Sequence, residues 1–183
     1  MTNFKNKLHE IIRVNHAGEM GAKVIYAGQM AAFKLKKDEE SLKIIRHMKE
    51  QEDAHFTYFD EKMKKEQVRP TAMQPIWKVG GFALGFLTAM LDKKAAMTCT
   101  TAVEETIDLH YQEQLNEVEE ELKSNNSAEL KDLNEKIEQF RREELEHRDI
   151  GYEHDAGQLK YFTPLSAFIK ATTKFAIAVS KKI

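Results

Sequence analysis

The sequence is poor in residues that break helices or cross-link chains. Its 183 residues include three prolines and eight glycines, while 32% are charged, a balance that favours helices. The single cysteine, Cys99, excludes an internal disulfide and any paired-cysteine metal site, and it fits a reducing compartment. The net charge of −2 lacks the positive excess of nucleic-acid-binding proteins, so we expect no nucleic-acid partner.

Long apolar runs are also missing. A membrane-spanning helix needs roughly 20 apolar residues, and the longest run here is 79–91 (VGGFALGFLTAML), bordered by Lys78 and Asp92. The first 15 residues have neither the apolar centre of a secretory signal nor the Arg- and Ser-rich composition of a transit peptide. We therefore expect either a cytosol-facing bacterial protein or a chain that has already been processed.

Apolar residues recur at helical spacing over most of the chain. The expected helices cover about 16–37, 39–67, 76–91, 94–123, 127–157 and 164–182. Asp38 and Ser127 are suitable N-caps. Pro75 suits a first turn, and Gly157 is expected to end the helix that precedes it. The pattern predicts one all-α domain over 1–183: a four-helix bundle with an apolar helix between its two hairpins and an amphipathic, basic C-terminal helix.

Two Glu-x-x-His pairs occur in the expected bundle helices, Glu52/His55 and Glu144/His147, and no other Glu has a His three residues later. Residues at this spacing lie on one face of a helix. Two such pairs, with one inward Glu from each of two further helices, form the ligand set of a four-helix di-iron carboxylate centre.

The apolar stripes of the other two bundle helices supply the missing carboxylates. Glu19 and Glu104 lie on these stripes, and each begins the same pattern, Glu-x6-Tyr-x2-Gln, at 19–29 and 104–114. Each copy precedes one Glu-x-x-His pair, so the chain reads as two helical hairpins of one design. The neighbouring glutamates fall on solvated faces and are not expected to bind metal: Glu50, Glu105, Glu143 and Glu146.

A metal explains these positions better than chance does. One Glu-x-x-His pair alone usually lies on the protein surface and has no function. Burying this many charges without a metal, however, would cost several kcal/mol per ion. Four carboxylates and two imidazoles suit Fe(II)/Fe(III) or Mn, and leave the choice between them open. The expected ligands are Glu19, Glu52, His55, Glu104, Glu144 and His147.

Other side chains have two interpretations each. Tyr26 and Tyr111, seven residues after the lone glutamates, either line the site or simply pack in the core. His110 and His154 either orient ligands through hydrogen bonds or are satisfied polar groups. Beyond the ligands, Tyr111 and His110 are the residues for which a catalytic role is expected.

The apolar helix 76–91 is either a buried core helix or an interfacial helix on a bilayer surface. A four-helix bundle already has its core, and Trp77 at the start of the segment with basic residues near its end suits an interface. The basic C-terminal helix favours the same interpretation, so we expect a lipid-facing surface here.

Ordered motifs run from about Ile12 to the last helix. They are Arg13–Glu19, Ile25–Gln29, Arg69–Thr71, Gly81–Gly85, Ala102–Glu105 with His110–Tyr111, and Glu143–Gly151. Together they resemble the demethoxyubiquinone hydroxylase family of ubiquinone biosynthesis. Asn15 departs from this pattern, because many members have Asp there.

The resemblance implies a ferritin-like di-iron monooxygenase that hydroxylates 2-polyprenyl-3-methyl-6-methoxy-1,4-benzoquinol with O2. It implies that the same six ligands bind two iron ions, with Glu52 and Glu144 as bridging carboxylates. It also implies a peripheral membrane protein, on the cytosolic face of a bacterial inner membrane or the matrix face of the mitochondrial one. Proteins of ubiquinone biosynthesis are the partners it suggests.

NADH is the ultimate electron donor that the resemblance implies. The sequence has no Gly-x-Gly-x-x-Gly motif after a strand. Electrons would therefore arrive through a partner protein or through the quinone itself.

Two other functions share parts of this pattern. A ferritin-like ferroxidase or peroxide-reducing di-iron protein would use the same six ligands, but it would not need the apolar helix 76–91. A metal-free quinone carrier on the membrane surface would need that helix, but it would purify without metal.

Overall fold

The computed structural model describes residues 2–182, so Met1 and Ile183, the two ends of the expected domain, lie outside the described residues. Every regular element of the described part is helical, which confirms the all-α prediction. The elements are α1 (Thr2–Lys36), α2 (Glu39–Lys65), α3 (Gln74–Leu91), α4 (Lys93–Leu122), α5 (Ala128–Glu153), a short 3-10 helix η1 (Ala156–Gln158) and α6 (Phe162–Ser180).

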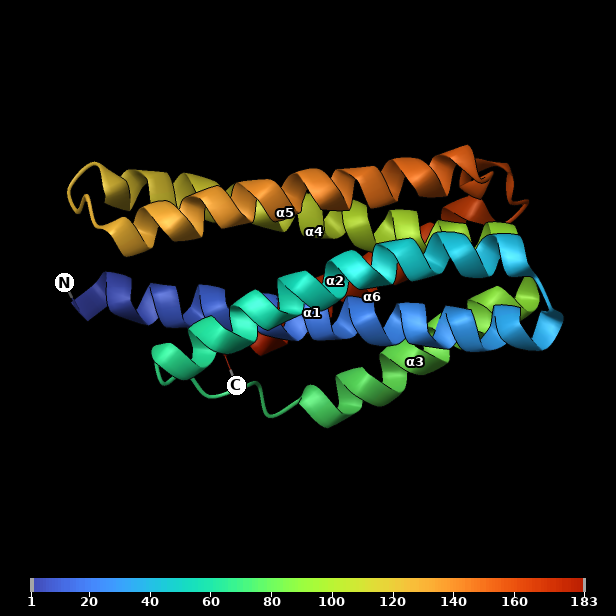
Figure 1. The fold of residues 1–183 in the computed structure, drawn as a ribbon, viewed down its shortest axis with the longest axis horizontal. Helices are drawn as coiled ribbons and strands as arrows, with labels where there is room; N and C mark the ends of the chain where they lie inside the picture. The colour runs from blue at the N-terminus through green and yellow to red at the C-terminus, as the bar shows by residue number, and fades with distance from the viewer. Residues whose placement is uncertain (1, 183) are drawn as a thin grey trace.

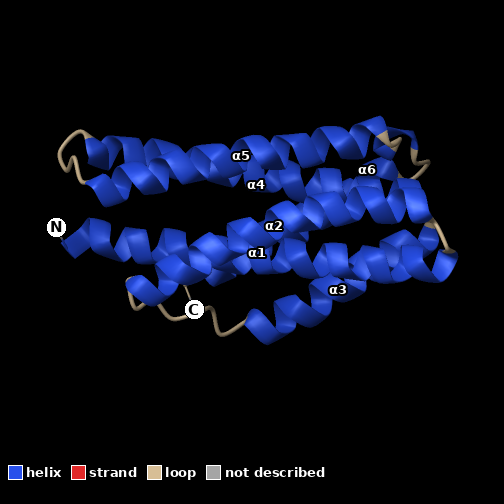
Figure 2. Cartoon of the chain, in the orientation of Figure 1, coloured by secondary structure: helices blue, strands red, loops and turns tan. Residues whose placement is uncertain are grey.

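The four long helices form two antiparallel hairpins that lie side by side (Figure 1). Helix α1 packs along α2, and α4 packs along α5. Helix α3 runs along the outer side of α1, and α6 packs on α4. Only short loops join the helices, apart from a longer connection between α2 and α3 (Figure 2).

Helix termini follow local sequence signals. Asp38 accepts a hydrogen bond from the Ser41 amide at the start of α2, and Ser127 accepts one from the Leu130 amide at the start of α5. Both N-caps were predicted, as was Pro75 in the first turn of α3. Such caps satisfy amides that have no partner within the helix.

Two predicted boundaries were wrong. The first helix begins at Thr2 rather than near residue 16, because Phe4, Leu8 and Ile11 continue the helical spacing and pack on the end of the second hairpin. The fourth long helix ends at Glu153 rather than at Gly157. Asp155 adopts the left-handed conformation with φ of 69°, and this residue, not the glycine, turns the chain.

The apolar core has two halves with the charged stripe residues between them. Along α1, Ile11 belongs to one half and Tyr26 to the other; along α4, Met97 and Val118 are divided in the same way. Glu19 lies between the first two in sequence. The layer that carries the glutamates and histidines therefore has buried apolar residues on both sides.

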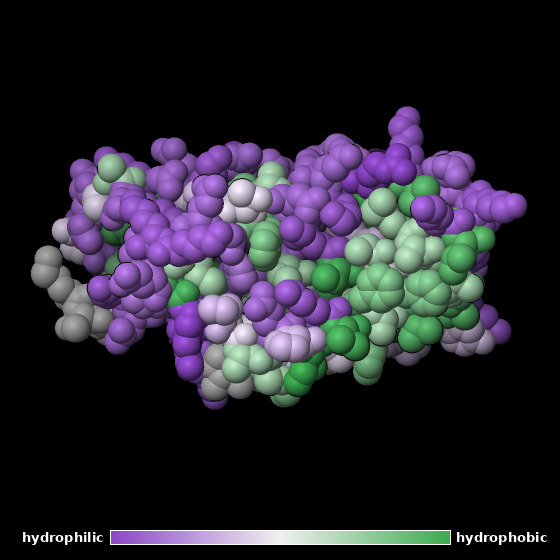
Figure 3. Space-filling model, turned by 60° about the horizontal axis from the view of Figure 1, so that its bottom comes forward, coloured by the Kyte–Doolittle hydropathy of each residue, from purple (hydrophilic) through white to green (hydrophobic). Residues whose placement is uncertain are grey.

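Helix α3 presents small residues to α1 and large apolar residues to solvent. A Cβ on Gly85 would lie 2.0 Å from the Ile25 carbonyl oxygen, and one on Gly28 would lie 2.2 Å from the Phe82 carbonyl oxygen. The helices thus meet backbone to backbone. The exposed large side chains of α3 are Ile76, Val79, Phe82, Leu87, Met90 and Leu91. Figure 3 shows hydrophobic residues gathered on this face.

This arrangement excludes the interpretation of α3 as a buried core helix, because its buried residues are Gly85, Thr88 and Ala89. Within residues 2–182, no helix combines the length and apolarity needed to cross a membrane.

Candidate metal centre

Each of the four bundle helices directs a carboxylate into the layer between the core halves. Glu19 comes from α1 and Glu104 from α4, while α2 and α5 each supply a Glu-x-x-His pair. All six side chains are buried, with Glu19 the most exposed at 3%. The structure therefore brings together the residues that the apolar periodicity selected.

The six side chains form two overlapping groups whose ligand atoms lie within 4.8 Å of one another. Both groups contain Glu52 and Glu144. His55 and Glu19 complete one group, which we call position 1; His147 and Glu104 complete the other, position 2. Two carboxylates shared between two such sets are the arrangement expected when carboxylates bridge a pair of metal ions.

The imidazoles face the centre through Nδ1. His55 Nδ1 lies 3.2 Å from Glu144 Oε1 and 3.4 Å from Glu19 Oε2. His147 Nδ1 lies 3.2 Å from Glu52 Oε1 and 3.1 Å from Glu144 Oε2. Each imidazole therefore offers the centre one nitrogen and keeps the other for a contact outside it.

The internal repeat links the two hairpins through tyrosines. The Tyr26 hydroxyl donates a 2.7 Å hydrogen bond to Glu104 Oε1, and the Tyr111 hydroxyl donates one to Glu19 Oε1. Each tyrosine thus holds the lone glutamate of the opposite hairpin. Both phenols are fully buried, and burial, followed by the charge of the glutamate each one contacts, raises their pKa well above the usual value.

The glutamines of the repeat also cross between hairpins. Gln114 and Asn15 exchange two amide hydrogen bonds of 2.8 and 2.9 Å. Gln29 donates to the Ala96 carbonyl oxygen at 3.0 Å. The exchange at Asn15 requires a side-chain donor, which an ionised aspartate lacks. Asn15 therefore makes a contact between the hairpins that an ionised aspartate could not reproduce.

The outer nitrogens of the two ligand histidines have partners that sequence periodicity missed. His55 Nε2 lies 2.5 Å from Glu143 Oε2, and His147 Nε2 lies 2.8 Å from Gln51 Oε1. Glu143 was assigned to a solvated face, but its side chain is only 24% exposed. One signal could have identified both partners: each directly precedes the Glu of a Glu-x-x-His pair on the helix opposite its histidine.

Burial and mutual repulsion favour protonation within the cluster. Burial, and then the charge of Glu144, raises the pKa of both Glu52 and Glu104 well above the usual value. Burial would lower the pKa of His55, but the nearby carboxylates of Glu144 and Glu19 outweigh it and raise that pKa to about 12. Without a cation, this layer therefore holds protons that compensate its carboxylate charge.

The unpaired polar atoms of the layer test whether a metal pair would fit. Among the described residues, His55 Nδ1 and five carboxylate oxygens have no hydrogen-bond partner: Glu19 Oε2, both oxygens of Glu52, Glu104 Oε2 and Glu144 Oε1. A buried acceptor without a partner costs about 1–3 kcal/mol. Two divalent cations would use these atoms and balance four carboxylate charges, so the residues fit a dinuclear centre with oxygen-rich ligation.

The remaining candidates lie outside this layer. His110 Nε2 accepts a 2.8 Å hydrogen bond from Gln114 and makes no hydrogen bond to the six side chains within the described chain. Burial, then the charges of Lys181 and Lys7, lowers its pKa to about 4. His154 forms the C-cap of α5. Of the two residues expected to act besides the ligands, Tyr111 alone contacts the cluster.

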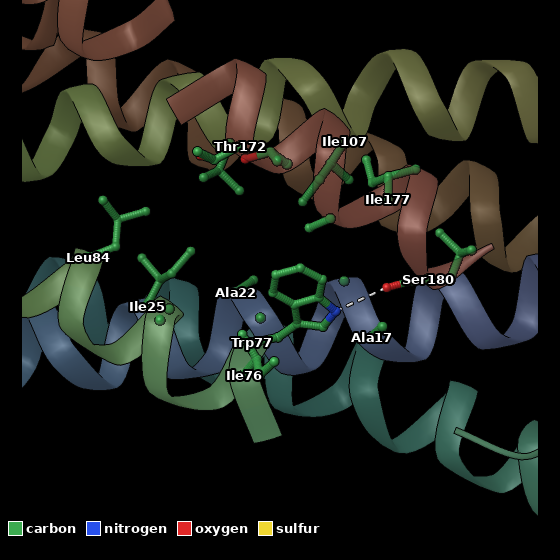
Figure 4. Close-up of a pocket in the computed structure, with 18 of the residues that line it drawn as sticks. Ala17, Ala22, Ile25, Ile76, Trp77, Leu84, Ile107, Thr172, Ile177 and Ser180 are labelled. Atoms are coloured by element: carbon green, nitrogen blue, oxygen red, sulfur yellow. Dashed lines mark hydrogen bonds between the residues drawn. The ribbon is translucent and has the colours of Figure 1, made fainter. Parts of the chain in front are cut away.

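An apolar cavity of about 420 Å³ lies between α1, α3, α4 and α6. Trp77 projects into it, and its indole Nε1 donates a 3.2 Å hydrogen bond to Ser180 (Figure 4). Gly18 and Val103 line the cavity, and each directly precedes a lone glutamate in sequence. The cavity and the cluster therefore use adjacent positions of α1 and α4.

Comparison with known proteins identified one matching family. The family described as "Ubiquinone biosynthesis protein COQ7" matches residues 6–180. The 3-demethoxyubiquinol 3-hydroxylase of Rhodospirillum rubrum is 46% identical over 96% of this chain and 78% of its own length.

Eukaryotic relatives are also similar. The human NADPH-dependent 3-demethoxyubiquinone 3-hydroxylase, mitochondrial, is 44% identical over 94% of this chain and 76% of its own. The 5-demethoxyubiquinone hydroxylase, mitochondrial, of Saccharomyces cerevisiae is 38% identical over 96% of this chain and 78% of its own.

Proposed function

Because the chain belongs to the family of the ubiquinone biosynthesis protein COQ7, we propose that it is a demethoxyubiquinol hydroxylase. It uses O2 to hydroxylate 2-polyprenyl-3-methyl-6-methoxy-1,4-benzoquinol, as one ferritin-like di-iron domain. The observation that carries this proposal is the pair of overlapping ligand groups that share Glu52 and Glu144. A large apolar cavity next to these groups is what an isoprenoid quinol requires and a ferroxidase does not.

The proposed iron ligands are Glu19, Glu52, His55, Glu104, Glu144 and His147. Two iron ions held there would supply the redox chemistry that O2 activation needs. Hydrogen bonds from Tyr26 and Tyr111 orient the lone glutamates. The core halves on either side of the layer keep bulk water away from it.

The substrate is proposed to lie in the apolar cavity. Its lining is almost entirely apolar, which suits an isoprenoid tail. Trp77 and Ser180 supply a hydrogen-bonded pair at one side of this lining. The ring would then approach the cluster from the side of α1 and α4, where Gly18 and Ala22 leave space.

The membrane surface is proposed to meet the exposed side of α3 and α6. Leu87 of α3 is 64% exposed, and Phe168 and Phe175 of α6 are 60% and 62% exposed. The lysines Lys78 and Lys182 are also exposed, and together these features suit an anionic bilayer. We propose the cytosolic face of a bacterial inner membrane, or the matrix face in mitochondria, as the location.

The electron donor is proposed to be a reduced nicotinamide nucleotide. NADH was expected, and several relatives are named NADPH-dependent. Every regular element of the described chain is helical, and the sequence has no Gly-x-Gly-x-x-Gly turn after a strand. Electrons therefore reach the centre through a partner protein of ubiquinone biosynthesis or through the quinone.

Complementation tests this function. The protein is expressed in a bacterial strain that lacks its own hydroxylase and accumulates demethoxyubiquinone, and ubiquinone is measured by mass spectrometry. Wild type and the exposed control Glu50→Gln should restore ubiquinone, whereas Glu52→Gln should not. A folded, iron-loaded wild-type protein that leaves the precursor unconverted contradicts the proposal. Two irons retained per chain by Glu52→Gln would contradict the ligand assignment.

A further inference from the structure

The two ligand histidines differ in the chemistry of their outer hydrogen bonds. His55 Nε2 contacts the carboxylate of Glu143 at 2.5 Å, and His147 Nε2 contacts the amide oxygen of Gln51 at 2.8 Å. A carboxylate and a carboxamide oxygen both accept, so each imidazole donates its N–H outward and turns Nδ1 to the centre.

The contacts are equivalent by position. Glu143 precedes Glu144 on α5 and reaches across to α2; Gln51 precedes Glu52 on α2 and reaches across to α5. Position 1 and position 2 each have one histidine, one lone glutamate and the two shared glutamates. The inner ligands therefore match in type, while the outer partners of the histidines differ in charge.

A charged acceptor changes what an imidazole gives to a metal. Hydrogen bonds to an ionised group are roughly twice as strong as neutral ones. An imidazole that donates to a carboxylate gains basicity at its other nitrogen, and such outer partners typically change metal affinity roughly 10–100-fold. Glu143 is held in place by a 2.9 Å hydrogen bond from Gln139, which fixes the direction of its carboxylate.

We infer that Gln51 and Glu143 make the two metal positions unequal. Glu143 makes the histidine ligand of position 1 more electron-rich, so position 1 binds iron more tightly and fills first. Gln51 leaves position 2 with the lower iron affinity. Both residues are positioning residues that act through the histidines. The inference rests on the dinuclear centre of the proposed function.

Exchange of the two partners tests this directly. Wild type, Gln51→Glu, Glu143→Gln and the double variant Gln51→Glu/Glu143→Gln are loaded with two equivalents of 57Fe(II) and studied by Mössbauer spectroscopy. Stepwise iron affinity is measured in parallel by calorimetry. Glu146→Gln, an exposed glutamate on the same helix, is the matched control.

Wild type and Glu146→Gln should show two distinct quadrupole doublets and two affinities. Glu143→Gln should weaken the tighter step about 10–100-fold and bring the doublets together. Gln51→Glu should also bring the doublets together, because it tightens the weaker iron-binding step. The double variant should separate them again. The exchanged side chains are nearly isosteric, so folding is checked simply by circular dichroism.

The same doublets and affinities in all four iron-loaded proteins would overturn the inference while leaving the proposed function intact. A folded wild-type protein that binds no iron overturns both. If one single variant fails to fold, the other still tests the inference, because each substitution alone changes the difference in iron affinity between the two positions.

Discussion

The hydroxyl of Tyr111 on α4 donates a hydrogen bond to Glu19 on α1, so the second hairpin holds a carboxylate of the first. Tyr26 makes the reciprocal bond to Glu104. These two contacts cross the bundle at the level of the cluster and join the two hairpins there.

Removal of one such bond should weaken the metal-free protein. Tyr111→Phe leaves Glu19 with a buried oxygen that loses its donor, which costs about 1–3 kcal/mol of unfolding free energy. Urea unfolding in the presence of a chelator measures it. Tyr152→Phe is the control, because Tyr152 is 41% exposed and its partner Glu105 lies outside the cluster. Equal losses in the two variants would contradict the cross-bundle role of Tyr111.

The metal-free protein should lose stability between pH 7 and pH 9. Burial, and then neighbouring carboxylate charge, raises the pKa of Glu52 and Glu104. The nearby carboxylates of Glu144 and Glu19 raise the pKa of His55 to about 12 against the effect of burial. The folded state therefore binds more protons than the unfolded state in this window. Stability then falls by about 1.4 kcal/mol per pH unit for each extra proton.

Histidines whose pKa is lowered by burial would make stability rise with pH, but they scarcely titrate in this window. Burial lowers the pKa of His16 and His110 below 6.5, so both are largely neutral in either state above pH 7. Urea titrations at pH 7, 8 and 9 check the result, and a flat or rising unfolding free energy would disprove it. Ferrous iron should reverse the trend, because metal binding displaces the same protons and grows stronger with pH.

Close packing of α3 on α1 should make Gly85 intolerant of a side chain. In Gly85→Ala the new Cβ would lie 2.0 Å from the Ile25 carbonyl oxygen, and such overpacking typically costs about 1–3 kcal/mol. Gly80→Ala is the matched control on the same helix, because nothing lies within 4 Å of its Cβ. Thermal unfolding distinguishes them, and similar midpoints for both variants would show that the helices separate easily.

Membrane binding should depend on the exposed side of α3. Leu87→Gln combined with Leu91→Gln removes side chains that are 64% and 73% exposed. Each loses about 1.5–3 kcal/mol of transfer free energy if it is buried in lipid. Flotation with vesicles that contain anionic lipid measures the effect. Leu109→Gln, at an exposed leucine of α4, is the control. Unchanged flotation of the double variant would remove α3 from the membrane contact, and loss of iron would indicate a packing role instead.

Filling the cavity should impair the use of long-tailed substrate. Gly21 lines the cavity and its Cβ would meet nothing within 4 Å, so Gly21→Leu projects into open volume without a backbone clash. KM should rise more for a long-tailed quinol than for a short-tailed analogue, while iron content stays at the wild-type level. A KM that changes equally for both quinols would argue against tail binding in this cavity.

Much of the centre was predictable because local rules govern it. Helical periodicity selected Glu19 and Glu104 over neighbours such as Glu105, since buried positions on a helix must follow its repeat. The internal Glu-x6-Tyr-x2-Gln repeat likewise indicated two equivalent hairpins. The caps Asp38 and Ser127 were readable because they depend only on nearby amides.

The tertiary structure decided whatever depends on the distance between helices. Periodicity assigned Glu143 to solvent, yet the approach of α2 brings His55 Nε2 to it. The partner of each tyrosine, the close packing of α3 on α1 and the apolar cavity follow from how the hairpins and outer helices pack. The sequence by itself determined which residues face the bundle centre, because one helix sets its own faces. Only packing between helices decided which side chains meet across it.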